Sequence, residues 1–352
     1  MSHFRDEIAE QPEVASRLLQ QSRDAVAAIG ARIHEFRPRG YLIAARGSSD
    51  HAALYAKYLF GARNRALVAL AAPSLFTHYA SPPNVEGQCV IGISQSGASP
   101  DVVSVLEEAR RQGALTVAIS NEAESPLARA ADLVLTLGAG QERSVPASKT
   151  YTASLLALAL ISQAVDPDVA FGAALSMVPQ AMARALEMDS DLEKLVAPLN
   201  GTRAIVLGRG FNFSTAEELA LKLMETSYVM ARAWSVADFE HGPIAVVDAG
   251  IPIIVVDGGG AVATSMRSIR ERIGAKGCPV VQLVDGKKGD KEGDKRGDVD
   301  PSTTVHLDSG LPEELTPISL TVLAQLLAHR VAVVRGFDPD SPREIRKVTR
   351  TW

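Results

Sequence analysis

The chain has 352 residues, of which 46% are hydrophobic and 22% charged, a composition typical of a soluble globular protein of two or three domains. Its 36 basic and 41 acidic residues give a formal net charge of −5, and the sequence has no basic stripe, which argues against a nucleic-acid partner. Only two cysteines, no metal-ligand spacing and a polar, acidic N-terminus predict a cytoplasmic protein with no metal, no cofactor, no signal peptide and no membrane span.

The first half of the chain is expected to begin with a helix, because apolar residues from Val14 to Ile33 recur at helical spacing within an N-terminal segment of residues 1–38. Strands and helices then alternate through a first domain at 39–198. Apolar runs predict strands at 41–45, 67–71, 89–93, 115–119 and 133–137, with helices at 52–60, from 100 onward, and at 149–165. Continuous apolar strands separated by helices indicate a parallel sheet covered on both faces.

A second domain at 199–337 repeats this scheme after a helical connector at 179–195. Strands are predicted at 204–207, 251–257 and 280–284, and helices at 215–231 and 316–334. The two domains open alike, with Ile43-Ala44-Ala45-Arg46-Gly47 in one and Val206-Leu207-Gly208-Arg209-Gly210 in the other. We therefore predict an α/β fold of two tandem doubly wound parallel-sheet domains, each a three-layer αβα sandwich, with a C-terminal tail at 338–352. The run at 285–300 mixes both charge signs with glycines and is typical of a solvated loop.

The most informative stretch is Ser94-Gln95-Ser96-Gly97, which lies between a buried strand and a helix. Such a junction offers free backbone N–H groups and the positive end of a helix dipole, and the hydroxyls, including Ser99, add donors for a phosphate monoester. Gly47-Ser48-Ser49 forms a second hydroxyl cluster at the same edge of the sheet. Neither turn matches the Walker or dinucleotide fingerprints, which argues against ATP and NAD.

Two helices carry further candidates. The segment from Glu142 to Thr150 precedes the long helix at 149–165; it either closes over a ligand or is an ordinary helix start capped by Ser148, and capping rules favour the second interpretation. Glu218, Lys222 and Glu225 share one face of a helix that is apolar all round. Such a helix is buried, and buried charges need partners.

Two loops add a histidine and a lysine. His241 is followed by Gly242-Pro243, which fixes a tight turn and makes this imidazole a candidate general acid and base. The tail from Asp338 either frays or folds back and presents Lys347.

Together these residues resemble the sugar isomerase (SIS) domain family, in particular the isomerase half of glutamine–fructose-6-phosphate aminotransferases and the stand-alone glucosamine-6-phosphate deaminases of that family. The resemblance covers nearly the whole chain. It is carried by Glu7-Ile8-Ala9-Glu10-Gln11-Pro12, Arg46-Gly47-Ser48-Ser49, Ser94-Gln95-Ser96-Gly97, Ala147-Ser148-Lys149, Gly208-Arg209-Gly210, Leu221-Lys222-Leu223-Met224-Glu225 and His241-Gly242-Pro243.

The resemblance implies roles for single residues. It implies that Glu225 transfers the proton, that His241 opens the sugar ring and that Lys347 forms a Schiff base. It places the phosphosugar pocket at Ser48, Ser49, Ser94, Gln95, Ser96, Ser99 and Val145, with Glu142, Lys222 and Glu218 at further pocket positions. It also implies a homodimer in which the histidine of one subunit enters the site of the other, and the run Val229-Met230-Ala231 with Trp234 would suit the interface.

The expected reaction converts glucosamine-6-phosphate to fructose-6-phosphate and ammonia through an open-chain proton transfer between C1 and C2. A fructosamine-phosphate deglycase, ammonia-dependent glucosamine-6-phosphate synthesis and a sugar-phosphate-sensing module without turnover remain alternatives. The synthases carry an N-terminal glutaminase with a cysteine nucleophile, whereas this chain has Ser2, so we expect no glutamine hydrolysis and favour deamination. Ala98, Ser99 and Ala147 depart from the family pattern and leave the sugar open. We also expect phosphate affinity in the first domain only, because Asp257 would repel an anion in the second.

Overall fold

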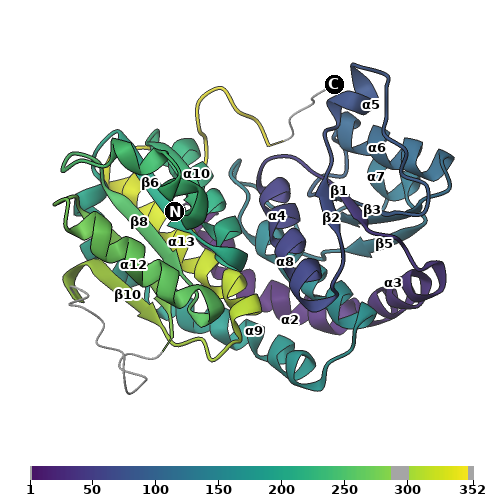
Figure 1. The fold of residues 1–352 in the computed structure, drawn as a ribbon, viewed down its shortest axis with the longest axis horizontal. Helices are drawn as coiled ribbons and strands as arrows, with labels where there is room; N and C mark the ends of the chain where they lie inside the picture. Colours follow the sequence, from purple (N-terminus) through teal and green to yellow (C-terminus); the bar gives the residue numbers. More distant parts are fainter. Residues whose placement is uncertain (1, 287–300, 348–352) are drawn as a thin grey trace. The chain divides into compact units, whose positions relative to one another are not determined.

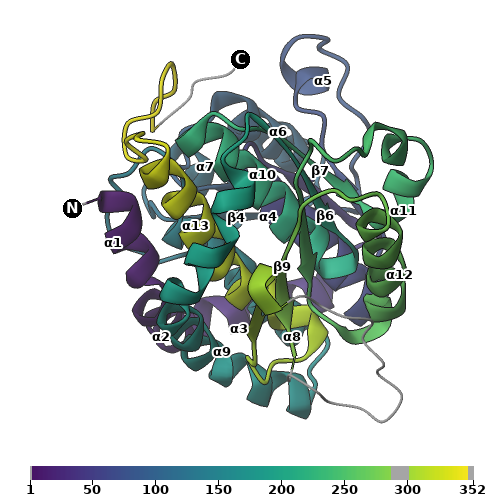
Figure 2. The same ribbon diagram turned by 90° about the vertical axis from the view of Figure 1, so that its left-hand side faces the viewer.

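The computed structural model describes residues 2–286 and 301–347 and contains two five-stranded parallel sheets with helices around them (Figures 1 and 2). The predicted fold class, two α/β repeats with parallel sheets, is therefore confirmed. Most of the expected charged loop, 287–300, and the last tail residues, 348–352, lie outside the described residues.

The first sheet has the strand order β2-β1-β3-β4-β5. Its strands are β1 (Tyr41–Ala44), β2 (Val68–Leu70), β3 (Cys89–Ser94), β4 (Leu115–Ser120) and β5 (Leu133–Thr136). Its helices are α4 (Ser48–Arg63), α5 (Ser74–Thr77), α6 (Pro100–Arg111), α7 (Pro126–Ala130) and α8 (Lys149–Val165). Figure 1 shows α4 and α8 on one face and α6 and α7 on the other. Every residue of β3 and β4 is buried, as the continuous apolar runs predict for central parallel strands.

The second sheet has the order β10-β9-β8-β6-β7. Its strands are β6 (Arg203–Gly208), β7 (Met230–Ser235), β8 (Ile253–Asp257), β9 (Val280–Asp285) and β10 (Thr304–Leu307), and its helices are α10 (Phe213–Ser227), α11 (Val236–Glu240), α12 (Ala263–Gly274) and α13 (Thr316–Val334). Helices α10 and α13 cover one face, and α11 and α12 the other (Figure 2). Numbered from its own first strand, each sheet has the order 2-1-3-4-5, so both repeats place their topological switch point between the first and third strands.

The chain divides into two compact units that are not contiguous in sequence. Unit 1 contains the second sheet and comprises residues 1–12, 143–146 and 177–344. Unit 2 contains the first sheet and comprises 13–142, 147–176 and 345–352.

The single N-terminal helix expected from the apolar spacing is wrong in detail, because three helices occupy the segment. They are α1 (His3–Ala9), α2 (Gln11–Gln21) and α3 (Arg23–Phe36). Pro12 lacks an amide hydrogen and its ring would clash with the carbonyl of residue 8, which explains the break after α1. At the second break, the Ser22 hydroxyl donates to the Leu18 carbonyl at 2.6 Å, a local bond that bends helices.

Two other boundaries differ from expectation. The helix predicted to reach residue 231 ends at Ser227, because Tyr228 adopts a left-handed φ of 55° and the chain enters strand β7. Val229 and Ala231 are consequently buried within the protomer, so the expected interface run keeps only Met230 and Trp234 as partly or fully exposed side chains. The connector is α9 (Val169–Glu187), with Pro179 inside the helix, followed by a 3-10 segment at Asp189–Leu195.

Two helical segments among the described residues, Val169–Glu187 and Glu313–Val334, are long and apolar enough to cross a membrane by length and composition. Core helices of soluble proteins pass the same test. In the second segment 78% of the apolar window is buried inside the protein, and it contains α13, which packs on α10.

Candidate active site

The hydroxyl-bearing turns of unit 2 lie at its switch point. Strands β1 and β3 are neighbours, with Ala44 opposite Gly92, so their carboxyl ends meet at one edge of the sheet. Ser48 and Ser49 open α4, and Ser94 is the last residue of β3. Ligands of open α/β sheets bind at this position.

The turn between β3 and α6 is tightly built. Gly97 has a φ of +59°, and a Cβ atom there would lie 2.1 Å from the Ser125 hydroxyl, so only glycine fits. The Ser94 side chain accepts from Gly97 N–H at 3.2 Å and that of Ser96 from Ala98 N–H at 3.3 Å. Ser99 is the N-cap residue of α6, but its side chain makes no capping hydrogen bond.

An ion pair between the two turns is a feature that the sequence analysis missed. Arg46, in the turn after β1, lies 2.6 Å from the carboxylate of Asp101 in the first turn of α6. Asp101 is buried, whereas the Arg46 side chain is half-exposed. The serine-lined turns therefore have a half-exposed guanidinium beside them, whose charge is balanced by the Asp101 carboxylate. The RGSS motif included Arg46, but no spacing in the sequence indicated its partner.

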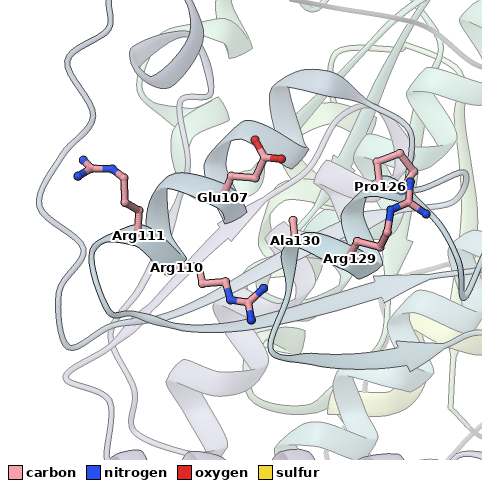
Figure 3. Close-up of a pocket in the computed structure, with 6 residues that line it drawn as sticks. All are labelled: Glu107, Arg110, Arg111, Pro126, Arg129 and Ala130. Carbon is pink, nitrogen blue, oxygen red and sulfur yellow. The ribbon is translucent and has the colours of Figure 1, made fainter.

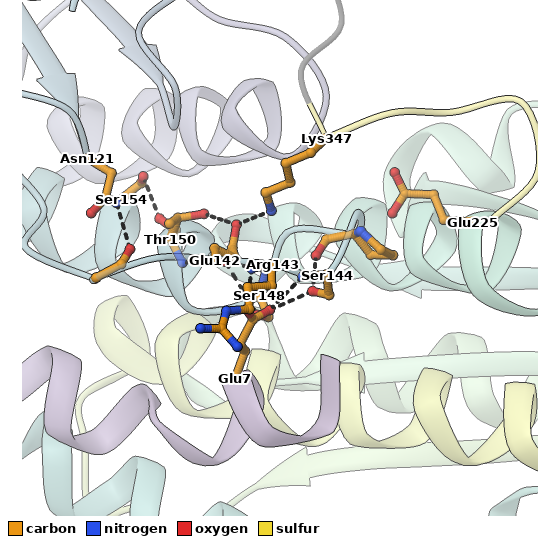
Figure 4. Close-up of polar contacts among 12 residues, drawn as sticks. Glu7, Asn121, Glu142, Arg143, Ser144, Ser148, Thr150, Ser154, Glu225 and Lys347 are labelled. Carbon is orange, nitrogen blue, oxygen red and sulfur yellow. Dashed lines mark hydrogen bonds and ion pairs between the residues drawn. The ribbon is translucent and has the colours of Figure 1, made fainter. Parts of the chain in front are cut away.

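A second group in unit 2 joins Glu142 to Lys347. The Lys347 ammonium lies 2.6 Å from Glu142 Oε2, and Figure 4 shows it pointing toward that carboxylate. The Glu142 carboxylate also accepts hydrogen bonds from Ser148 N–H at 3.0 Å, Thr150 N–H at 3.0 Å and the Thr150 hydroxyl at 2.8 Å. Burial alone would raise the pKa of Glu142, but Lys347 and these hydrogen bonds outweigh it and hold the pKa below its ordinary value.

These contacts correct the interpretation of Ser148 as an ordinary cap. Ser148 occupies the N-cap position of α8, but its side chain makes no capping hydrogen bond there. The Glu142 carboxylate instead accepts hydrogen bonds from the N–H groups of residues 148 and 150. The tail is likewise not frayed over its described part, because Lys347 is held by an ion pair and Arg343 N–H donates to the Tyr228 hydroxyl at 3.1 Å.

In unit 1, helix α1 binds both the chain after Glu142 and the tail. Glu7 is 3% exposed, and its carboxylate accepts from the amides of Arg143 and Ser144 and from the Ser144 hydroxyl at 2.6 Å (Figure 4). Asp340 of the tail accepts from Phe4 N–H at 2.7 Å and from the Ser2 hydroxyl at 2.9 Å, and so caps α1. The Asp340 carbonyl accepts from Val145 N–H at 3.3 Å, the bond that fixes this expected pocket residue.

The buried charge cluster of unit 1 lies on α10. Lys222 is 1% exposed and lies 3.4 Å from Glu218 and 2.6 Å from Glu225, so both pairings expected from the helical spacing are present. The Glu225 side chain is 19% exposed, whereas that of Glu218 is fully buried. Burial would lower the pKa of Lys222, but the two carboxylates outweigh it and raise that pKa, so the lysine stays charged and fixes Glu225.

His241 is not joined to this cluster. It follows α11, its side chain is exposed, and its amide donates to the Asp238 carbonyl at 3.1 Å. Gly242, with a φ of +149°, provides the sharp turn expected after it. Within the described residues of unit 1, no hydrogen bond or ion pair links the imidazole with Glu225.

The switch point of unit 1 is filled by the protein itself. The Glu313 carboxylate accepts from Ala261 N–H, in the turn after β8, at 2.6 Å. A Cβ atom on Gly260 would lie 1.8 Å from the same carboxylate, and one on Gly210, in the turn after β6, 3.7 Å from it. Glu313 thus lies where a bound anion would lie between the two turns. Asp257, at the end of β8, is a second carboxylate near it and pairs with Arg270 at 3.5 Å.

A hollow of about 580 Å³ is lined by residues of α6 and α7 (Figure 3). Arg110, Arg111 and Arg129 line it but point in different directions, and the first two pair with Asp132 and Glu108. They do not converge on a common point. Across residues 2–286 and 301–347, no group of three acidic, histidine or cysteine side chains could hold a metal ion.

Comparison with known proteins identifies relatives over almost the entire chain. The SIS domain family model matches residues 38–163 and 200–334. A glutamine–fructose-6-phosphate aminotransferase (isomerizing) from Thermococcus kodakarensis is 32% identical over 97% of this chain and 56% of its own length, so the chain spans about half of that relative.

Solved structures show the same fold. The C-terminal domain of glucosamine-fructose-6-phosphate aminotransferase from Francisella tularensis matches with a TM-score of 0.86 and 27% identity, covering 97% of this chain and 98% of that domain. A glucosamine-6-phosphate deaminase from Thermotoga maritima matches with a TM-score of 0.76 and 21% identity over 99% of this chain and 100% of its own, a likeness in fold.

Proposed function

The chain belongs to the SIS domain family, and from this membership we propose that it is a sugar-phosphate isomerase that deaminates glucosamine-6-phosphate. The products are fructose-6-phosphate and ammonia, and the reaction takes place in the cytoplasm. The names of the similar proteins support a phosphorylated hexose or its 2-amino derivative as substrate.

The observation that carries the proposal is the presence of two lysine–carboxylate clusters in addition to the serine turns. One holds Glu225 against the buried Lys222, and the other holds Lys347 against the buried Glu142. A module that only binds a sugar phosphate needs the turns but not these ionised groups, whose burial costs free energy.

In the proposed mechanism, the serine turns of unit 2 bind the phosphate. The donors are backbone N–H groups at the starts of α4 and α6, the Gln95 side-chain amide, and the hydroxyls of Ser48, Ser49, Ser94, Ser96 and Ser99. Holding the phosphate fixes the far end of the open-chain sugar and orients C1 and C2 for proton transfer.

The chemistry then needs three proton shifts and one water. His241 moves the O1 proton to O5 and opens the ring, which exposes the C1 aldehyde. Glu225 removes the C2 proton and delivers it to C1 while one amine proton moves to O1, so the 2-amino aldose becomes a C2 imine with a C1 hydroxyl. Lys347 gives a proton to the imine nitrogen and attacks C2 as the neutral amine, so ammonia leaves and a protonated Lys347 imine remains. Water hydrolyses that imine to the ketone and restores the Lys347 ammonium. The balance is one water consumed and one ammonia released, with no redox step.

The test is an assay that measures both products. Purified protein is incubated with glucosamine-6-phosphate, and ammonia and fructose-6-phosphate are measured separately. Both should appear in equal amounts, and Glu225→Gln should abolish them while keeping the fold. Ketose without ammonia, or neither product, contradicts the proposal.

The alternatives are distinguished by changing the substrate. Fructose-6-phosphate with ammonium tests synthesis, which uses the same proton transfer in reverse, and a fructosamine-6-phosphate tests a deglycase. If sugar phosphates bind but none turns over, the chain is a sensing module.

A further inference from the structure

Two side chains bind the backbone on either side of Glu142, one shortly before it and one immediately after it. We propose that Asn121 and Glu7 are positioning residues for Glu142 and, through it, for the Glu142–Lys347 pair. The proposal rests on the proposed function, in which Lys347 reacts with the sugar. Neither residue is assigned a direct contact with the substrate.

Asn121 holds the segment before Glu142, within unit 2. Its side-chain amide donates to the Gly140 carbonyl at 2.8 Å, and its side-chain oxygen accepts from Ala139 N–H at 2.8 Å. Gly138 and Gly140 have φ angles of 59° and 68°, so this segment folds through two left-handed residues and makes no helix or strand of its own. A bidentate side chain therefore supplies the hydrogen bonds that regular structure would otherwise supply.

Asn121 is also linked to the phosphate turn, but through its backbone. Its N–H donates to the Gln95 carbonyl at 3.1 Å, a backbone bond that Asn121→Ala leaves in place. Replacing the side chain should therefore release the segment at 139–142 without disturbing the turn at 94–99.

Glu7 holds the segment after Glu142, within unit 1. Its buried carboxylate accepts from two consecutive amides, those of Arg143 and Ser144, and from the Ser144 hydroxyl. Arg143 directly follows Glu142 in the sequence, so Glu7 binds the backbone at the residue after Glu142. The charge of Glu7 matters because hydrogen bonds to a carboxylate are about twice as strong as neutral ones.

The precision of Glu142 matters for the chemistry. Its carboxylate lies 2.6 Å from the Lys347 ammonium, and the ion pair fixes where that amine is presented. A displacement of about 1 Å at a reacting group can lower the rate roughly a hundredfold. The effect should fall on turnover, because the phosphate is held by separate turns.

The experiment compares Asn121→Ala and Glu7→Gln with two matched controls. Asn84→Ala removes an exposed-loop side chain that accepts one local hydrogen bond from Glu86, and Asp6→Asn removes an exposed carboxylate from the same helix as Glu7. Each test variant should lower kcat for the deamination at least about tenfold. The inhibition constant of inorganic phosphate should stay within about twofold of wild type, a split that general destabilisation would not produce. The controls should match wild type.

Hydrogen–deuterium exchange provides a readout that needs no turnover. The amides of peptides spanning 139–147 should exchange faster than in wild type in both test variants and at the wild-type rate in both controls. The amides at 94–99 should stay protected in all four. Full activity in either test variant, or a loss of activity with unaltered exchange at 139–147, overturns the role of that residue. A wild-type chain with no turnover on any substrate instead overturns the proposed function.

Discussion

The Ser96 hydroxyl lies in the turn between β3 and α6 and accepts a hydrogen bond from Ala98 N–H. If the phosphate binds there, Ser96→Ala removes one donor to a charged group and should weaken substrate binding by about 1–3 kcal/mol. The Michaelis constant for glucosamine-6-phosphate measures this loss. Ser104→Ala is the control, because that hydroxyl bonds the Pro100 carbonyl within the same helix. An unchanged Michaelis constant in Ser96→Ala would place the phosphate elsewhere.

Asp285 gives a pH-dependent prediction that is independent of catalysis. It ends β9, is 7% exposed, and burial raises the pKa of its carboxyl from 3.8 to about 6 despite a hydrogen bond from Ser309 N–H at 3.0 Å. Between these two values the folded chain keeps a proton that the unfolded chain has lost. Folding stability therefore falls as the pH rises through this window and stays lowered above pH 6, by up to about 3 kcal/mol.

Asp285→Asn removes this titration. The free energy of unfolding of the variant, relative to that of wild type, should rise by on the order of 2 kcal/mol from pH 4.5 to pH 7.5. Urea denaturation of both proteins at both pH values measures this change. Asp24→Asn, at an exposed position in the first turn of α3, should show no such change. A stability difference that is equal at both pH values would contradict the assignment.

At the level of single residues, the sequence predicted contacts that are local and missed those that join distant segments. The Lys222 pairs follow from helical spacing, since residues three and four apart share a face. The missed contacts depend on which strands are neighbours and on where the loops lead the chain. They pair Arg46 with Asp101, Glu7 with Ser144 and Asn121 with Ala139. No single spacing encodes those contacts. The catalytic and binding roles of the expected site residues remain predictions.

The two switch points are alike in topology but not in occupancy, and this predicts the binding stoichiometry. In unit 2 serine side chains border the switch point, whereas in unit 1 the Glu313 carboxylate occupies it and Asp257 lies close by. A sugar phosphate would have to displace one carboxylate and approach another. Fructose-6-phosphate should therefore bind once per chain in equilibrium dialysis, and two equivalent sites per chain would contradict this.

Among the elements, central strands and long helices were predictable and the edges were not. The largely apolar sequences of β3, β4 and β8 predicted strands clearly because both of their faces are buried. Strand β7 alternates exposed and buried residues at an edge of the sheet and directly follows α10, so its start resembled a continuing helix. Strand β10 and helix α12 have weaker patterns, and only the pairing of β10 with β9 completes the second sheet.

For the whole molecule, the expected homodimer leads to a complementation test. Met230 is 73% exposed on the edge strand β7 and Met224 is 41% exposed on α10, apolar surface of the kind that dimers cover. We expect His241→Ala and Glu225→Ala to be inactive alone. If the histidine acts in the partner's site, half of the randomly mixed dimers contain one intact site, which restores about a quarter of wild-type activity.

The control for this experiment is His241→Ala mixed with itself, taken through the same dissociation and reassociation. Activity should then stay absent. If the two-variant mixture also remains inactive although mass spectrometry detects heterodimers, each site is built from one chain.

The interleaving of the two units has a consequence for recombination between homologues. The chain passes from one unit to the other after residues 12, 142, 146, 176 and 344, so no single crossover exchanges one unit as a whole. A chimera with one breakpoint anywhere from 143 to 346 takes Glu142 from one parent and Lys347 from the other. A single breakpoint before residue 142 leaves both residues of the ion pair in one parent's segment. Exchanging a segment that lies between them while keeping both from one parent requires two crossovers.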